Sequence, residues 1–455
     1  MSVFTGDIHK KHSYQCTCGM THSSPIGMTV IREGALEALP EVLEHLGLGK
    51  NVLVVTDSMV YDIIGKSAIE LWEKAGLNIQ KTVFQLPLIP DERALGIVMV
   101  AATKDMDAII CLGGGSITDI CRYVATRLGK PHIPVPTAIT HDGFFTDMAL
   151  LIIGGMKTTL SCDPPTAVVA DMSVIRNAPL RMNAAGLGEM AAKQTAVMDW
   201  YAASLIRGEL FCEETEALML GAIKQAFASS DGIAERDPAA LNSLTDALYR
   251  SAVDMYWYGS ARTGAGAEHH LTHYWVMRHN NRGEKPNLHG AEVGVGTVLV
   301  LDMWQRMLAI DEKTFDVEAA VSKMPTREEW EAMVEKGYGE AAPEAFKAQK
   351  NKSFDRDARR KEIEAILAAM PKLREKYASF LPDYRELAKK LKAAGAPYVP
   401  SQLHVTREEL MDSVLYAKEV RSKYTSLWVA DALGLLPELA VALADDAEAL
   451  EKELG

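Results

Sequence analysis

The sequence lacks the features that would place the protein in or across a membrane. It contains no run of about 18 apolar residues, the length that a helix needs to span the bilayer. The N-terminal segment MSVFTGDIHKKHSYQ has no apolar core of the kind found in secretory signals. Cysteine is also scarce, with 6 residues in 455, and several stand in apolar runs such as the one around Cys111. Such spacing is typical of buried thiols in a reducing compartment, so we expect a cytoplasmic protein without membrane insertion.

Positive charge is in short supply. Lys and Arg number 48 against 61 Asp and Glu, which gives a formal net charge of −13. This balance argues against nucleic acid or an anionic membrane as a general partner, because both attract basic proteins. A small anionic substrate is still compatible with it, since such a substrate needs only a local positive pocket. The length and the ordinary hydrophobic content of 48% suit a globular chain of two or three domains.

Short apolar strands alternate with helical patterns over the first part of the chain. The predicted strands cover residues 50–56, 107–112, 131–136 and 166–170. Continuous apolar strands separated by helices are typical of a parallel sheet covered on both faces. From about residue 184 onward, including the highly charged stretch 314–392, apolar residues recur at helical spacing instead. The sequence therefore predicts an α/β domain over residues 1–178 and an all-helical domain over residues 179–455.

A glycine-rich turn connects the second predicted strand to a helix. Gly113, Gly114 and Gly115 stand in this turn and are followed by Ser116. Glycine lets the backbone approach an anion closely, and the first N–H groups of a helix attract a phosphate. Ser116 and Asp119 have the spacing of a helix-capping pair, so all five residues are candidates for binding a dinucleotide cofactor. A tight turn without a ligand is the alternative, because the spacing is not the common G-x-G-x-x-G pattern.

Two further segments lie at the carboxyl ends of predicted strands, where open α/β sheets bind ligands. Asp57 ends the first strand and is a candidate for binding an adenosine ribose hydroxyl, with a helix cap or turn as the alternative. The segment TAITHDGF follows the third strand and contains His141 and Asp142. These two residues are candidates for contacting the nicotinamide or the substrate, and the alternative is a capped helix start.

A carboxylate and two imidazoles in the second half form a candidate metal site. Glu189 lies in GEMAAK, His269 in GAEHHLTH and His289 in NLHGAE. Three such ligands with an open position are typical of a catalytic divalent ion, which acts as a Lewis acid on a substrate oxygen. His273 is four residues beyond His269 and shares its helix face. Surface or hydrogen-bonded histidines are the alternative, and the H-E-x-x-H pattern of metalloproteases is absent.

Two cations are candidates for binding an anionic substrate group. Lys193 follows Glu189 by one helical turn, so it either forms an i,i+4 ion pair with it or contacts a phosphate. Arg262 carries a guanidinium, which binds phosphate through two parallel hydrogen bonds. Both residues also have an ordinary structural interpretation.

The N-terminal segment contains Cys16 and Cys18, with His12 and His22 on either side. These residue types can bind zinc. Two cysteines one residue apart, without a second cysteine pair, are a poor zinc signature. The sequence therefore favours a structural turn here.

Taken together, several segments in this order resemble the sn-glycerol-1-phosphate dehydrogenases. That family belongs with the dehydroquinate synthases, the glycerol dehydrogenases and the iron-type alcohol dehydrogenases. The resemblance spans about residues 12–435. The similar segments are CLGGGSITDICRY, VPTAITHDG, GLGEMAAKQTAVMDW, GSARTGAGAEHHLTHYW, LHGAEVGVGTVLV and EVRSKYTSLWVADALGLL.

This resemblance implies a Rossmann-like N-terminal domain, a helical C-terminal domain and an active site in the cleft between them. It implies NAD(P)H-dependent reduction of dihydroxyacetone phosphate, a small polyol phosphate, to sn-glycerol 1-phosphate. The family's metal ligands fall on Glu189, His269 and His289. The cofactor pyrophosphate falls on the glycine turn, while Thr137 and Asp142 fall near the nicotinamide. A homodimer is also implied.

The expected mechanism follows from these assignments. A divalent metal polarises the ketone, NAD(P)H delivers hydride, and solvent or His273 supplies a proton. Lys193 or Arg262 neutralises the phosphate. Zinc is the expected ion, with nickel and iron as alternatives, and Asp57 favours NAD because its charge repels a 2′-phosphate.

Three alternatives to this function stay open. One is a dehydroquinate synthase-type enzyme, because the synthases carry Glu where dehydrogenases of this group usually carry Asp at the position of Glu189. The second is a glycerol dehydrogenase. The third is a catalytically silent protein that binds a nucleotide or a sugar phosphate.

Overall fold

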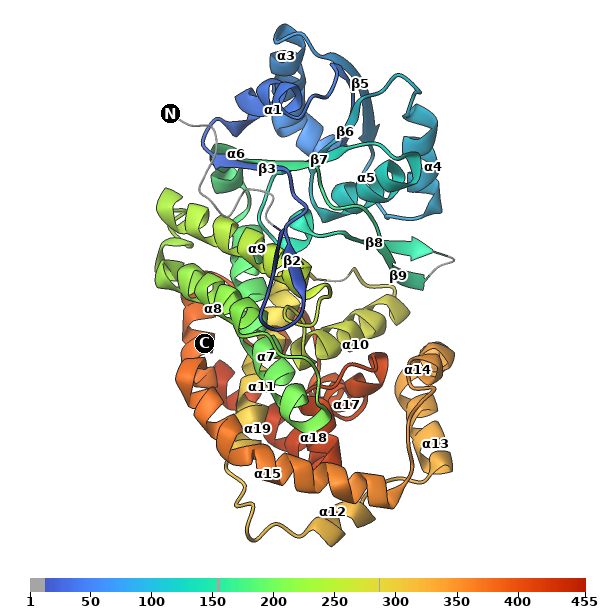
Figure 1. Ribbon diagram of the computed structural model, residues 1–455, viewed down its shortest axis with the longest axis vertical. Coiled ribbons are helices and arrows are strands. Elements are labelled where there is room, and N and C mark those ends of the chain that lie inside the picture. Colours follow the sequence, from blue (N-terminus) through green and yellow to red (C-terminus); the bar gives the residue numbers. More distant parts are fainter. Residues whose placement is uncertain (1–12, 154–155, 286) are drawn as a thin grey trace. The chain divides into compact units, whose positions relative to one another are not determined.

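The computed structural model describes residues 13–153, 156–285 and 287–455, and the chain forms two compact units. His12 lies outside the described residues. The first unit comprises Met1–Asn183 and Glu235–Gly259. The second comprises Ala184–Ala234 and Ser260–Gly455. Figure 1 colours the chain from blue in the first unit to red at the end of the second.

The first unit is built on a four-stranded parallel sheet with the order β5-β4-β6-β7. Its strands are β4 (Asn51–Asp57), β5 (Asn78–Phe84), β6 (Ala108–Gly113) and β7 (His132–Pro136). Every residue of β6 and β7 is buried. Strands that are apolar on both sides need cover on both faces, which matches the parallel arrangement. The predicted α/β class of this part of the chain is confirmed.

Helices cover the two faces of this sheet (Figure 1). One face packs Trp72 and its neighbours against Val52 and Val54. The opposite face packs Val124 and its neighbours against Leu53. The helices are α1 (Leu39–His45) and α3 (Lys66–Lys74) on the first face, and α4 (Glu92–Ala101) and α5 (Gly115–Leu128) on the second; α2 (Ser58–Val60) follows β4.

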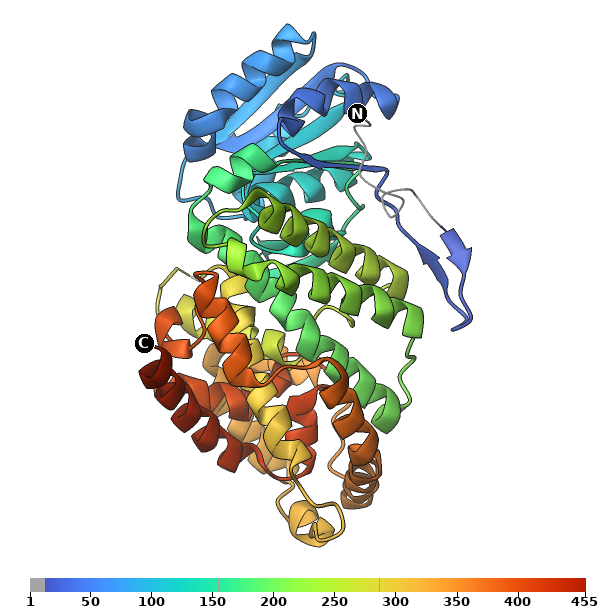
Figure 2. The ribbon, with the colours of Figure 1, turned by 90° about the vertical axis from the view of Figure 1, so that its left-hand side faces the viewer.

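Three smaller strand pairs complete the first unit. Strand β10 (Ala167–Asp171) pairs in parallel with β3 (Met28–Arg32). Strands β8 (Met148–Ile153) and β9 (Met156–Ser161) form an antiparallel hairpin. A second hairpin, of β1 (Ser13–Gln15) and β2 (Thr21–Ser23), lies at the start of the described chain and is seen from the side in Figure 2. The four predicted strands are all present, within about one residue of their expected bounds.

Helix α9 (Pro238–Tyr258) belongs to the first unit, which differs from the predicted boundary. The Ser251 hydroxyl donates to Asp142 at 2.8 Å, and the Tyr256 hydroxyl donates to the carbonyl of Phe145 at 3.0 Å. Tyr249 and Phe145 also pack edge to face. The helical period of α9 is the same as that of its neighbours in sequence, so the pattern could not reveal which unit it joins.

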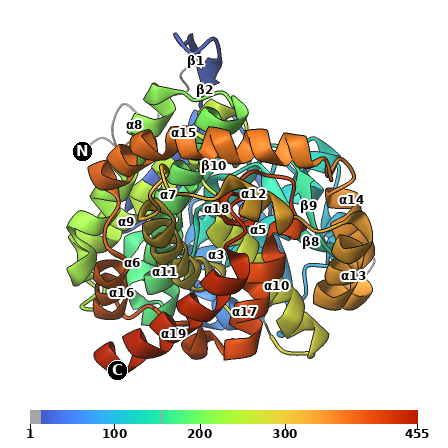
Figure 3. The ribbon, with the colours of Figure 1, turned by 90° about the horizontal axis from the view of Figure 1, so that it is seen from below.

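Among the described residues of the second unit, every regular element is a helix, as predicted. The charged stretch folds into helices with buried apolar positions such as Ile363 and Leu373, and its longest helix, α15, is the orange helix in Figure 3. None of the described helices combines the length and the apolar character that a membrane span requires. The helices are α7 (Leu180–Arg207, which begins in the first unit), α8 (Glu213–Ala228), α10 (Ala267–Asn281), α11 (His289–Leu308), α12 (Val317–Ser322), α13 (Arg327–Tyr338), α14 (Ala342–Ala348), α15 (Arg356–Phe380), α16 (Tyr384–Ala393), α17 (Arg407–Tyr416), α18 (Ser426–Ala432) and α19 (Leu436–Leu454); α6 (Met172–Asn177) lies in the first unit.

Helices α7 and α11 approach each other through backbone atoms. A methyl group added to Gly188 on α7 would collide with the carbonyl oxygen of Gly290 and lie 3.3 Å from the Cα of Gly294. Glycine is therefore required at Gly188 by the close approach of the two helices. The contact lies directly beside two predicted metal ligands, Glu189 on α7 and His289 on α11.

We expect Gly188→Ala to destabilise the protein by about 1–3 kcal/mol, because the added methyl meets backbone that cannot rotate away. Chemical denaturation measures this change. Gly221→Ala on α8 is the matched control, because its added methyl meets no atom within 4 Å. Since alanine is the better helix former, the control gains about 0.5–1 kcal/mol. Equal stability of the two variants would show that α7 and α11 have room to separate.

Candidate functional site

The turn between β6 and α5 exposes backbone N–H groups at the start of a helix. Gly113 has a φ of 156°, which residues with side chains rarely adopt. Gly114 is the N-cap of α5, and no side chain caps the helix there. A methyl group added to Gly114 would meet no atom within 4 Å, so the space beside this backbone is open. Uncapped N–H groups beside open space are what a phosphate group requires.

The predicted capping pair of Ser116 and Asp119 is wrong, because the helix already begins at Gly115. The glycine turn bends without a side-chain cap, so Ser116 falls inside the first turn and is exposed. The Asp119 carboxylate accepts from the buried Arg122 guanidinium at 3.1 Å. Arg122 also donates to the carbonyls of Gly143 and Met148, both at 2.6 Å. Asp119 therefore helps to fix the loop after β7.

The loop after β7 packs against the glycine turn. The Thr137 N–H donates to the carbonyl of Gly113 at 3.4 Å. A methyl group on Gly115 would lie 2.7 Å from Nε2 of His141, so the imidazole covers that glycine. The Asp142 carboxylate is buried and accepts the Ser251 hydroxyl at 2.8 Å. The structure thus brings Thr137 and His141 to the glycine turn, while the Asp142 carboxylate accepts a hydrogen bond from α9.

Asp57 lies at the same edge of the sheet. Strands β4, β6 and β7 are parallel neighbours, so the end of β4, the glycine turn and Thr137 share the carboxyl edge. One carboxylate oxygen of Asp57 accepts from the Val60 N–H at 2.9 Å and caps α2. The structure shows this capping role, which was one of the two predicted for Asp57.

In the second unit, helices α7, α10 and α11 bring Glu189, His269 and His289 together. Their three candidate ligand atoms all lie within 4.8 Å of one another. Nε2 of His269 is 3.8 Å from Oε1 of Glu189, and Nε2 of His289 is 3.8 Å from Oε2. Ligand atoms of a tetrahedral ion with bonds of about 2.0–2.2 Å are roughly 3.4 Å apart, so little movement is needed to close on a metal.

The donor set fits a divalent cation. Glu189 is buried, and its Oε2 makes no hydrogen bond. A buried carboxylate oxygen without a partner is costly unless a cation approaches it. His269 and His289 are less buried than Glu189, so an open side remains for a further ligand.

Glu268 orients His269 and was missed by the sequence reasoning. Its Oε1 accepts from Nδ1 of His269 at 2.9 Å, and its Oε2 accepts from the Thr195 hydroxyl at 2.7 Å. Burial alone would raise the pKa of Glu268, but the hydrogen bonds from His269 and Thr195 outweigh it and hold that pKa below its ordinary value. An ionised Glu268 keeps the proton on Nδ1 of His269, which leaves the lone pair on Nε2, the nitrogen that could bind a metal. The sequence does contain a signal for this role, because an acidic residue stands directly before a candidate metal ligand at the start of a helix.

Lys193 forms a buried ion pair with Glu189. Its ammonium lies 2.6 Å from Oε1 of Glu189 and donates to the carbonyl of Gly264 at 3.1 Å. Of the two predicted roles for Lys193, the contacts show the i,i+4 ion pair, in a buried setting. This pair offsets the carboxylate charge that the fold has removed from water.

The Arg262 guanidinium forms several hydrogen bonds to other groups of the protein. Its Nε donates to Glu209 at 2.7 Å, and its Nη2 donates to the carbonyls of Asp199 and Tyr424 at 3.0 and 2.8 Å. Its Nη1 is buried and makes no hydrogen bond. Nη1 is therefore the one nitrogen of this guanidinium that is left for a further acceptor. His273 lies one turn beyond His269 on α10 and is half-buried.

Known structures share this fold. The glycerol dehydrogenase of Schizosaccharomyces pombe is 16% identical with a TM-score of 0.58, over 92% of this chain and 90% of that one. A probable glycerol dehydrogenase of Sinorhizobium meliloti is 17% identical with a TM-score of 0.59, over 92% and 97%. The family model of the iron-containing alcohol dehydrogenases matches residues 30–179. These matches define the class of fold as that of the iron-containing alcohol dehydrogenases.

Three relatives with higher sequence identity share the same name. The glycerol-1-phosphate dehydrogenase (NAD(P)+) of Halalkalibacterium halodurans is 32% identical over 317 residues, covering 68% of this chain and 79% of that protein. The enzyme of the same name from Bacillus licheniformis is 27% identical over 94% of this chain and 95% of its own. That from Thermococcus sibiricus is 33% identical over 60% and 75%. The chain belongs to the glycerol-1-phosphate dehydrogenase family.

The open space beside Gly114 predicts that Gly114→Ala loses cofactor affinity without losing stability. Alanine accepts the φ of −85° found there, and its methyl would stand where a phosphate approaches the N–H groups. We expect the dissociation constant for NADH, measured by calorimetry, to rise about tenfold or more. Gly96→Ala on α4, whose methyl also meets nothing within 4 Å, is the control and keeps wild-type affinity. Unchanged NADH binding by Gly114→Ala would remove the glycine turn from the cofactor site.

The ligand cluster predicts that His289→Ala holds one divalent ion fewer per chain than the wild type. Loss of a residue that only hydrogen-bonds to a metal ligand lowers metal affinity about 10- to 100-fold. We expect the loss of a ligand itself to lower the affinity further. Elemental analysis after gel filtration counts the ions. His273→Ala is the control because His273 lies outside the cluster, and it keeps the wild-type count. Equal metal content in both variants would contradict the assignment.

Proposed function

We propose that this chain catalyses the NAD(P)H-dependent reduction of dihydroxyacetone phosphate to sn-glycerol 1-phosphate. The observation that carries the proposal is the convergence of Glu189, His269 and His289 in a chain of the glycerol-1-phosphate dehydrogenase family. The reaction moves a hydride from the nicotinamide to the ketone carbon and a proton to the ketone oxygen. A small polyol phosphate is thus the proposed substrate.

The proposed cofactor site is the carboxyl edge of the sheet in the first unit. The N–H groups at Gly114 and Gly115 would hold the pyrophosphate, with Ser116 in the same first helical turn. Asp57 would face the ribose, and its negative charge favours NAD over NADP. Thr137, His141 and Asp142 would stand near the nicotinamide, since their loop packs on the glycine turn.

The proposed metal site is the Glu189, His269 and His289 cluster. A divalent ion held there would act as a Lewis acid on the ketone oxygen, and zinc suits the nitrogen and oxygen donors, as do nickel and iron. Glu268 keeps Nε2 of His269 available, and Lys193 balances the charge of Glu189. His273 is the proposed proton donor because it lies one turn from His269 on the same face of α10.

The proposed contacts to the substrate phosphate are Lys193 and Arg262. Because the Lys193 ammonium pairs with Glu189, it would attract the phosphate through its positive charge. Arg262 can offer Nη1 while Glu209 and two carbonyls hold the rest of its guanidinium. A homodimer is proposed from the family resemblance, and sedimentation measures it directly.

The proposal is tested by following NADH oxidation with dihydroxyacetone phosphate and with dihydroxyacetone side by side. We expect kcat/KM to be about 10- to 100-fold higher for the phosphate, because charged hydrogen bonds contribute about 1.5–3 kcal/mol. An enzyme that oxidises only sn-glycerol 3-phosphate serves as a stereochemical control and leaves the product untouched.

Other outcomes separate the rival functions. Preference for dihydroxyacetone would make the chain a glycerol dehydrogenase. Binding of NADH with no net oxidation in either assay would contradict the proposed reaction, and would leave the synthase and the silent binding protein.

A further inference from the structure

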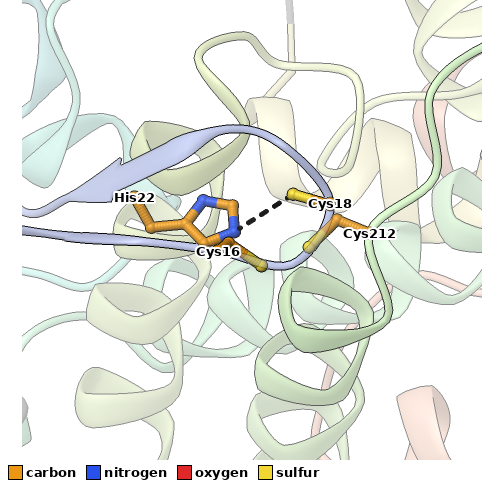
Figure 4. Close-up of side chains that lie close together, drawn as sticks. All are labelled: Cys16, Cys18, His22 and Cys212. Atoms are coloured by element: carbon orange, nitrogen blue, oxygen red, sulfur yellow. Dashed lines mark hydrogen bonds between the residues drawn. The ribbon is translucent and has the colours of Figure 1, made fainter.

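A second cluster of metal-binding side chains lies in the β1–β2 hairpin of the first unit. Cys16 and Cys18 stand in the turn, and His22 stands in β2. Figure 4 draws these three side chains, together with Cys212, which belongs to the second unit. None of the three takes part in the dehydrogenase chemistry proposed above.

The turn places both thiols and the imidazole close together. The Gly19 N–H donates to the carbonyl of Cys16 at 3.1 Å, and the Cys16 N–H donates to the carbonyl of Met20 at 2.9 Å. Gly19 has a φ of 91°, which closes this tight turn. The Sγ atoms of Cys16 and Cys18 and a ring nitrogen of His22 lie within 4.8 Å of one another.

The spacing of the donors is that of a zinc site. Sγ of Cys18 and Nε2 of His22 are 3.7 Å apart. Zinc bonds of about 2.3 Å to sulfur and 2.0 Å to nitrogen put tetrahedral ligands roughly 3.5 Å from each other. A small contraction therefore brings these atoms onto one ion.

His22 is held in the tautomer that a metal needs. Its Nδ1 lies 2.7 Å from the carbonyl oxygen of Trp257, which can only accept, so Nδ1 carries the proton. Nε2 then has the lone pair, and this is the nitrogen that faces Cys18. The Trp257 ring stacks on the imidazole at 5.4 Å, and His22 is fully buried, so the ring cannot turn away. An outer hydrogen bond to the second nitrogen is typical of metal-binding histidines.

The hairpin is too short to hold this arrangement by itself. Each strand has three residues, and all of β1 is exposed. An isolated two-stranded hairpin is marginally stable at best, and small elements of this kind gain from a covalent or metal link. A metal ion at the turn would join Cys16 and Cys18 to His22, and through His22 to α9.

We propose that Cys16, Cys18 and His22 bind a structural Zn²⁺ ion. Thiolates and imidazole select zinc over magnesium or calcium, which prefer oxygen ligands. Binding releases the two thiol protons to solvent and leaves a centre in which two thiolates balance the charge of the ion. Structural zinc takes four ligands, so a further ligand completes the three from the hairpin. This inference does not rest on the proposed enzymatic function.

The test uses metal-free full-length protein titrated with Co²⁺, which replaces zinc and gives a strong absorption band when bonded to thiolate. We expect Co²⁺ to produce this band in the wild type and Zn²⁺ to abolish it. The Glu189, His269 and His289 cluster has no sulfur, so His269→Ala keeps the band and the two sites are distinguished. Cys18→Ser, at a partly exposed position, loses the band, whereas Cys162→Ser, the matched control, retains it.

A wild-type protein that binds Co²⁺ without a thiolate band would overturn the proposal and leave a simple thiol–imidazole hydrogen bond between Cys18 and His22. A band that survives in Cys18→Ser would also overturn it. Zinc release is a second measurement. A mercurial reagent frees one zinc ion per chain from the wild type and none from Cys18→Ser.

Discussion

The candidate metal site depends on contacts that helix α11 makes through glycine. Gly294 and Gly290 on α11 meet Gly188 on α7, and a methyl group on Gly296 would lie 2.9 Å from the carbonyl oxygen of Glu268 on α10. Because no side chains separate these helices, His289 reaches both Glu189 and His269. Larger residues at these positions would push the helices apart and separate the candidate ligand atoms. Ligand geometry is thus set by backbone packing rather than by the ligands themselves.

This packing buries charge, and the surrounding groups compensate for it. Glu189 and Glu268 are both almost fully buried, which is unfavourable for isolated carboxylates. Lys193 pairs with the first, while His269 and Thr195 donate to the second. The one oxygen left without a hydrogen bond is Oε2 of Glu189, which faces His289. This oxygen is the one that the proposed cation would approach.

The sequence predicted the parts of the structure that depend on local pattern. The buried strands around Cys111 and the i,i+4 relation of Glu189 and Lys193 follow from periodicity, and the glycine turn follows from composition. The helix start at Gly115 did not, because Ser116 and Asp119 have the spacing of a capping pair but lie two residues beyond the true N-cap, Gly114. Contacts over long separations were also out of reach. No local signal joins Arg262 to Tyr424 or places α9 in the first unit, since both depend on packing between distant segments.

The two clusters differ in how much negative charge their donor atoms supply to a bound ion. One carboxylate and two neutral imidazoles leave a divalent ion with a net positive charge, and the half-buried histidines leave it an open side. Such an ion can still withdraw electrons from a ketone oxygen. Two thiolates and an imidazole leave no net charge, and softer sulfur donors reduce Lewis acidity further. Donor type therefore supports a chemical role for the proposed metal at the Glu189 cluster and a structural role for the proposed metal at the cysteine cluster, even if both sites hold the same element.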